Sequence, residues 1–148
     1  MGSFEYFDLS GDVGLRAFGA TLEETFIHAS LGMYSLITDL DAIEKKKTKS
    51  IAVTGRSLDI LLVSWLNELI FHFDAYGFIG KQINIHTLEC DSAEYNTLNT
   101  CSLSAVIEGE EFDPQRHQGK LLIKAATYHM LRIKKTEGGW ELSVIFDI

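Results

Sequence analysis

The chain has 148 residues, of which 46% are hydrophobic, and it carries a formal net charge of −8 at pH 7. A chain of this size can bury one sizeable core, so we expect a single domain over residues 1–148, with residues 1–3 compatible with a cloning remnant. The negative charge argues against tight, direct binding to nucleic acid, because such binders present a basic face to phosphate. No signal peptide or membrane-spanning apolar stretch is recognisable, which predicts a cytoplasmic protein without membrane contact.

The first part of the chain is predicted to form a strand hairpin and then a helix. Alternating apolar residues predict strands at 4–8 and 13–18, and the turn between them leaves Asp12 at a strand edge. Thr21 and Glu24 have the spacing of a capping box, which opens a helix. The apolar residues of this helix recur at spacings of three and four, which predicts one buried stripe. The stripe consists of Leu22, Phe26, Ala29, Met33 and Leu36.

The middle of the chain predicts a strand followed by the central core helix. Residues 44–49 contain four lysines and are interpreted as a solvated connection that precedes a strand at 51–54. Ser57 can cap the next helix, and Gly77 is a stop signal for it. An apolar stripe of this density is typical of a core helix and not of a cofactor pocket. Its members are Leu58, Leu61, Leu62, Trp65, Leu66, Leu69, Ile70 and Phe73.

From residue 78 onward the pattern predicts β-structure. Strands are expected at 78–91, 98–108, 121–127, 129–135 and 140–147. Because the strands cluster late in the chain, the expected fold class is α+β. We expect a single-domain, two-layer sandwich, in which one mixed or antiparallel sheet is covered by the two main helices.

Cys90 and Cys101 are the only cysteines, too few and too far apart for a zinc knuckle. A hairpin centred near residues 95–96 would place them opposite one another, so a redox-dependent bond is one alternative. In a cytosolic setting we expect both thiols to be reduced.

Residues near the two ends of the chain are the best candidates for chemistry. Asp147, beside the C-terminal carboxylate of Ile148, and Asp12 concentrate the hard oxygen donors that suit Ca²⁺, Mg²⁺ or Mn²⁺. The strand at 140–147 would hold this terminus in place, whereas a frayed and solvated terminus is the alternative. Lys124 lies in the apolar strand expected at 121–127, where it either points to solvent or neutralises a carboxylate cluster.

Two histidines and one aspartate are candidate supporting residues. His117 lies in the one proline-containing loop, in which Asp113 can organise a turn, and His129 follows Lys124 in the same β-region. The sequence contains no zinc-protease helix motif, EF-hand loop, phosphate-binding glycine loop or nucleophile elbow.

Seven segments, in order along nearly the whole chain, resemble the archease family. This resemblance implies a small α+β protein that assists an RtcB-type RNA ligase in tRNA splicing and RNA repair. The helper is not itself an enzyme; it promotes guanylylation of the ligase and repeated turnover, and it meets RNA only through the ligase. The segments are 12–19 (DVGLRAFG), 21–26 (TLEETF), 29–39 (ASLGMYSLITD), 61–69 (LLVSWLNEL), 109–117 (GEEFDPQRH), 124–129 (KAATYH) and 139–148 (GWELSVIFDI).

The resemblance also implies a site. The metal ligands of the family map onto Asp12, Asp147 and Ile148, of which Ile148 would contribute main-chain oxygen, and the functional cation maps onto Lys124. Ca²⁺ is the expected ion, with Mg²⁺ and Mn²⁺ as alternatives. The usual turn of the family reads His-Thr-Ala-Asp, whereas this chain has Leu-Ser-Gly-Asp, so Leu9 replaces an imidazole at the edge of the site.

Two other functions stay open at the level of sequence. The first is a stand-alone metal-dependent hydrolase or phosphotransferase that uses Asp12, Asp147 and Lys124, with His129 as a further member. The second is a structural adaptor whose terminal carboxylates bind nothing of consequence.

Overall fold

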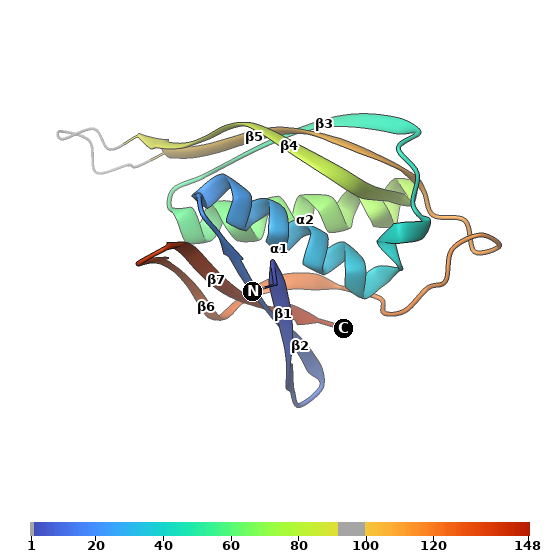
Figure 1. The fold of residues 1–148 in the computed structure, drawn as a ribbon, viewed down its shortest axis with the longest axis horizontal. Coiled ribbons are helices and arrows are strands. Elements are labelled where there is room, and N and C mark those ends of the chain that lie inside the picture. The colour runs from blue at the N-terminus through green and yellow to red at the C-terminus, as the bar shows by residue number, and fades with distance from the viewer. Residues whose placement is uncertain (1, 92–99) are drawn as a thin grey trace.

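Two antiparallel sheets enclose a pair of helices in the computed structural model, which describes residues 2–91 and 100–148 (Figure 1). The four-stranded sheet has the order β1-β2-β7-β6, and the three-stranded sheet has the order β3-β5-β4. The elements in chain order are β1 (Phe4–Leu9), β2 (Asp12–Gly19), α1 (Leu22–Ile37), the short 3-10 helix η1 (Leu40–Ala42), β3 (Lys47–Gly55), α2 (Leu58–Tyr76), β4 (Phe78–Asp91), β5 (Thr100–Glu111), β6 (Ala125–Thr136) and β7 (Gly139–Asp147).

The α+β fold class is confirmed, but the expectation of one helix-covered sheet is wrong. Helix α1 contacts β2 and β4, and α2 contacts β6 and β3, so both helices lie between the two sheets. The reason is visible in α2, because its buried residues cover a wide arc that no single sheet could bury. These residues are Leu61, Leu62, Val63, Trp65, Leu66, Leu69 and Ile70. Neither α1 nor α2, the two long helices of the described chain, has the combination of length and apolar character that a membrane-spanning helix needs.

The helix ends confirm the predicted caps. The Thr21 side chain accepts a hydrogen bond of 3.1 Å from the backbone N–H of Glu24, and Ser57 accepts one of 3.2 Å from that of Ile60. Gly77 closes α2 in the left-handed conformation with φ of 70°, which glycine adopts without steric cost.

Trp65 joins the two helices at the centre of the core. Its side chain is fully buried, and its Nε1–H donates a 2.8 Å hydrogen bond to Oγ of Ser30 on α1. The Ser30 hydroxyl in turn donates to the carbonyl of Phe26, also at 2.8 Å. The one polar atom of the largest buried side chain is therefore satisfied inside the core.

Strand β3 begins earlier than expected. Lys47 and Lys49 belong to the strand, so the interpretation of 44–49 as a connection holds only up to residue 46. The Lys47 ammonium pairs with Glu111 at 2.6 Å, and that of Lys49 lies 3.9 Å from the ring centroid of Tyr76. These partners let charged residues extend an edge strand.

Strand β6 differs from the two short strands expected in its place. Residues 121–124 are not part of a strand, so the strand position predicted for Lys124 is wrong, and β6 runs without a break from Ala125 to Thr136. In its register with β7, Thr127 pairs with Ile145 and Arg132 pairs with Ser143. Four residues of β6, 128–131, therefore lie opposite one residue of β7 and form a bulge. Periodicity cannot detect such an insertion.

The cysteines lie as the predicted hairpin requires, but they are bonded. Cys90 and Cys101 are partners in the β4–β5 register, with Cα atoms 3.9 Å apart, and they form a disulfide. The expectation of two reduced thiols is thus wrong for this structure, and the alternative of a bond is present. The turn expected near residues 95–96 falls outside the described residues.

Candidate functional site

The hairpin turn between β1 and β2 places Asp12 at one end of the four-stranded sheet. Leu9 and Asp12 are register partners, so only Ser10 and Gly11 form the turn. Gly11 has φ of 81°, a conformation that a residue with a Cβ rarely adopts. The turn thus makes Asp12 the first residue of β2, and its half-buried side chain lies next to Leu9.

The register of the sheet brings the two predicted metal-binding aspartates together. Asp12 is the direct partner of Asp147, although 135 positions separate them in the chain. On the other side of β7, Asp147 pairs with Ala125, and its carbonyl accepts a 2.8 Å hydrogen bond from the backbone N–H of Lys124. Asp12, Asp147, Lys124 and the adjoining Ile148 therefore meet at one end of the sheet.

The end of β7 is held firmly, which removes the alternative of a frayed terminus. Strand β7 lies between β2 and β6, and its residues Val144, Ile145 and Phe146 are all buried. Asp147 itself is exposed, and Ile148 follows it with 37% of its surface exposed. A buried strand thus presents an accessible carboxylate at its last position.

The donor set fits a hard divalent cation but does not complete its coordination. Two carboxylates and the main-chain oxygen of Ile148 are ligands of the type that Ca²⁺ prefers, and this ion takes about six to eight oxygens. Within residues 2–91 and 100–148, no three His, Cys, Asp or Glu side chains gather closely enough to hold a metal by themselves. Further ligands would have to be water or groups of a partner molecule.

Lys124 presents its backbone to this acidic end and its side chain to solvent. The side chain is exposed and makes no ion pair with any described carboxylate. Of the two alternatives for this residue, the structure shows the solvent-facing one. The ammonium group is therefore available to a ligand or partner that approaches the acidic end.

The structure does not bring the supporting residues to the acidic end. His129 lies on the exposed bulge of β6, where its backbone N–H donates to Oγ1 of Thr127 at 3.4 Å. His117 and Asp113 belong to a separate cluster in the loop that follows β5. Strand β5 is part of the three-stranded sheet. His117 is buried, with 3% of its surface exposed, so its imidazole is a structural element.

A buried carboxylate, Glu110, lies at the centre of that second cluster and was missed from the sequence. Both Nη atoms of Arg116 donate to it, at 2.9 and 3.3 Å, and the backbone N–H of Glu44 donates at 2.6 Å. The Nδ1 atom of His117 accepts a 2.9 Å hydrogen bond from the N–H of Asp113, so Nε2 carries the proton and faces Glu110 at 3.3 Å. The cluster fixes the start of the connection that leads to Lys124.

We expect Glu110 to make stability pH-dependent in acid. Its hydrogen bonds from Arg116, helped by the N–H of Glu44, lower its pKa from 4.5 to about 2. A carboxylate with a depressed folded-state pKa stabilises the fold above its unfolded pKa, and this contribution is lost as the pH falls from 4.5 to about 2. The difference in unfolding free energy between wild type and Glu110→Gln should therefore shrink over this range, as urea denaturation at several pH values can measure. Glu108→Gln is the control. If its difference from wild type in unfolding free energy shrinks as much as that of Glu110→Gln, the pH dependence does not come from Glu110.

Comparisons with known proteins agree over the full length of the chain. The family model described as "Archease protein family (MTH1598/TM1083)" matches residues 4–148. "Protein archease" of Methanosarcina mazei is 32% identical over 145 residues, which cover 98% of this chain and 95% of that protein. "Protein archease" of Saccharolobus islandicus strain M.14.25 is 34% identical and covers 100% of both chains. The solution structure of Methanobacterium thermoautotrophicum protein 1598 superposes with a TM-score of 0.78 at 30% identity and covers 100% of both chains.

Proposed function

Since this chain belongs to the archease family, we propose that it is a metal-binding protein cofactor that activates an RtcB-type RNA ligase in the cytoplasmic splicing of tRNA and in RNA repair. In this proposal the protein promotes guanylylation of the ligase and so permits repeated turnover. The ligase binds the RNA, and the protein meets RNA only through this partner.

One observation carries the proposal, namely the direct pairing of Asp12 with Asp147 at the end of the sheet. Two adjacent carboxylates attract a divalent cation, for which Ca²⁺ is our first choice, with Mg²⁺ and Mn²⁺ as alternatives. A cation bound there can neutralise and orient phosphate oxygens during an in-line displacement. The incomplete ligand set leaves coordination positions for groups of the ligase or of its nucleotide.

The residues around this pair suit contact with a partner. The exposed ammonium group of Lys124 can pair with a carboxylate or phosphate that approaches the acidic end. Leu9 contributes an apolar side chain where the family has an imidazole, so it favours an apolar contact over a hydrogen bond. The net charge of −8 complements a ligase surface that binds RNA and nucleotide, and such complementarity accelerates association.

A stand-alone hydrolase or phosphotransferase is the second candidate, and the site supports it less well. The acidic end offers two aspartate carboxylates, the main-chain oxygen of Ile148 and one ammonium group, and among the described residues no side-chain nucleophile is hydrogen-bonded to a base there. His129, the further member considered for such a site, makes no ring hydrogen bond with a described residue. Turnover of a nucleotide or phosphoester by the pure protein would favour this second function.

RNA ligation with RNA in excess over an RtcB-type ligase tests the proposal. Without this protein we expect about one round of joining per ligase, and with it many rounds. A ligase already known to respond to another archease serves as the positive control. If that ligase responds to its own archease and not to this protein at any ratio, the proposal is wrong.

A further inference from the structure

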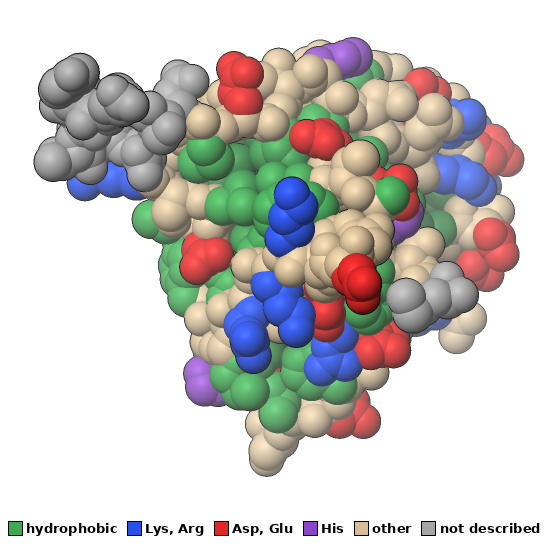
Figure 2. All heavy atoms as spheres, turned by 60° about the vertical axis from the view of Figure 1, so that its left-hand side comes forward, with side chains coloured by type: hydrophobic (Ala, Val, Ile, Leu, Met, Phe, Trp, Pro, Cys, Tyr) green, Lys and Arg blue, Asp and Glu red, His purple; other side chains and the backbone are tan. Residues whose placement is uncertain are grey.

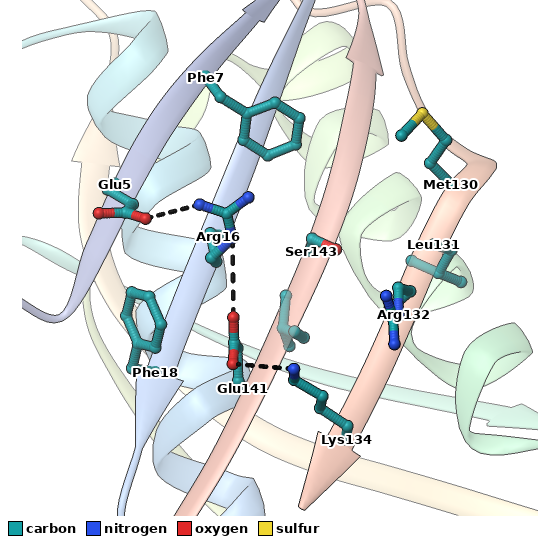
Figure 3. A pocket seen from close by; sticks show the side chains of 11 residues that line it. Glu5, Phe7, Arg16, Phe18, Met130, Leu131, Arg132, Lys134, Glu141 and Ser143 are labelled. Atoms are coloured by element: carbon teal, nitrogen blue, oxygen red, sulfur yellow. Dashed lines mark hydrogen bonds and ion pairs between the residues drawn. The ribbon is translucent and has the colours of Figure 1, made fainter. Parts of the chain in front are cut away.

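The outer face of the four-stranded sheet carries a groove that the proposed function does not use (Figure 3). Both helices lie on the inner face, so no described helix covers this one. The groove has a volume of about 700 Å³, within the range of small-molecule sites. Its sides come from β1 and β2 on one side and from β6 on the other, with β7 in the floor.

The strand register shows which residues share this outer face. Side chains alternate along a strand, so Asp12, Gly14, Arg16 and Phe18 of β2 lie on the outer face, while Leu15 and Ala17 point into the core. The row across the sheet at Arg16 contains Glu5, Ser143 and Arg132, and the next row contains Glu141 and Lys134. The groove therefore concentrates three of the cations of an acidic protein.

A chain of ion pairs accounts for two of those three cations. Arg16 lies 2.7 Å from Glu5 and 3.7 Å from Glu141, and the ammonium of Lys134 also lies 3.7 Å from Glu141 (Figure 3). Arg132 makes no ion pair or side-chain hydrogen bond with any described residue. The groove thus has one cation more than it has carboxylates, and that guanidinium is exposed.

Phenyl rings form the apolar part of the groove. The ring of Phe7 lies over Gly14, where a Cβ atom would overlap it, and the guanidinium carbon of Arg16 is 5.0 Å from its centroid. Phe18 supplies a second ring, from β2. Half-buried rings beside guanidinium groups offer a planar ligand both stacking and cation–π contacts.

The bulge in β6 forms part of the wall of the groove that lies opposite β1 and β2. Met130 has φ of 54°, the only positive φ of a non-glycine residue in the part of the chain that the structure describes. Such a conformation costs free energy, and strained residues of this kind cluster at active and ligand-binding sites. The bulge turns the Met130 side chain toward the groove opening, with 60% of its surface exposed. Methionine adapts its shape to flat ligands.

We propose that this groove is a nucleotide-binding site that accepts a nucleoside monophosphate. The base would stack on the phenyl ring of Phe18, the phosphate would pair with the guanidinium of Arg132, and Phe7, two register rows away, would line the far end of the groove. A mononucleotide fits better than a long nucleic acid, because basic and acidic side chains are interspersed on the face that Figure 2 presents. The net charge of −8 also opposes a polyanion more strongly than a small ligand.

This site is separate from the acidic end, although both lie on the same face. Arg16 is four residues from Asp12 along β2, which corresponds to about 13 Å. Binding to the groove therefore needs neither a metal nor a ligase, and it can be measured on the isolated protein in the presence of a chelator. If no nucleotide binds in the groove, the proposed activation of the ligase is unaffected. If the ligase is not activated, nucleotide binding in the groove is likewise unaffected.

Titration of the isolated protein with AMP, GMP and inorganic phosphate, followed by calorimetry and by NMR shifts of β6 and β7, tests the proposal. Arg132→Gln and Phe18→Ala should each weaken nucleotide binding by on the order of tenfold. Lys135→Gln is the matched control, because it removes the same charge from the same strand outside the groove. Absence of saturable binding, or equal affinities of wild type and Arg132→Gln, would overturn the proposal.

Two further outcomes separate related ligands. Inorganic phosphate that binds as tightly as AMP would show an anion site without base stacking and would refute the role of the Phe18 ring. A short single-stranded RNA that binds far more tightly than AMP or GMP would replace the nucleotide with a polynucleotide as the occupant. NMR shifts confined to the groove residues, with nucleotide preferred over phosphate, would support the proposal.

Discussion

Replacement of Asp12 by asparagine is expected to weaken Ca²⁺ binding by at least about tenfold and to remove the stimulation of RNA ligation, with the fold intact. Affinity for a hard cation depends on the number of charged oxygen ligands, and the substitution removes one of the two carboxylates that the register brings together. The side chain is only half-buried, so the loss of charge costs the core nothing. Calorimetry with Ca²⁺, Mg²⁺ and Mn²⁺, together with ligation under RNA excess, measures both effects.

Asp8→Asn is the matched control for this prediction. Asp8 belongs to the same hairpin, one position before Leu9, but it alternates to the opposite face of the sheet and is exposed. Its replacement removes the same charge near the same turn and should leave both readouts unchanged. Equal losses in the two variants would show a general electrostatic effect and no metal site at Asp12. Metal binding that survives Asp12→Asn would point to a different set of ligands.

Truncation of Trp65 to alanine is expected to lower the free energy of unfolding by about 3–5 kcal/mol. The side chain is fully buried in the core cluster, so its truncation removes apolar contacts and leaves a cavity. Trp65→Phe keeps most of the apolar volume and loses the hydrogen bond to Ser30, so a loss of about 1–2 kcal/mol is expected. Urea denaturation followed by circular dichroism measures both variants.

Phe71→Ala on the same helix is the control, because 52% of the Phe71 surface is exposed. It should change the free energy of unfolding by less than about 1 kcal/mol, the usual size of a surface effect. If Trp65→Ala costs no more than Phe71→Ala, the core does not depend on this side chain as the structure implies. If Trp65→Ala is too unstable to purify, Trp65→Phe still tests the prediction.

Local features of the fold were predictable because their causes are local. The cap at Thr21 and the stop at Gly77 depend on residues within four positions, and both lie where the sequence places them. Which strands pair is a long-range property, so the division into two sheets could not be seen. The strand predicted at 121–127 was partly wrong because residues 121–123 are apolar but have no pairing partner. Composition does not show whether such a partner exists.

The site was predictable in its chemistry and not in its geometry. Oxygen donors at Asp12 and Asp147 follow from residue type, whereas their direct pairing depends on β7 inserting beside β2. Nothing in the local sequence indicated that Glu110 is buried. Its buried carboxylate accepts hydrogen bonds from the backbone of Glu44, 66 positions away, and from Arg116. The bulge that raises Met130 beside the groove is an insertion in the register, which hydrophobic periodicity does not record.

The position of β7 has a consequence for biosynthesis. This strand follows all six others in the chain, yet it occupies an interior place between β2 and β6. At about 5–20 residues per second, the ribosome needs roughly 6–24 s to proceed from the end of β2 to the start of β7. During that interval the edge of β2 that later pairs with β7 has no partner strand. A nascent chain that stalls before residue 139 would be a natural client for chaperones.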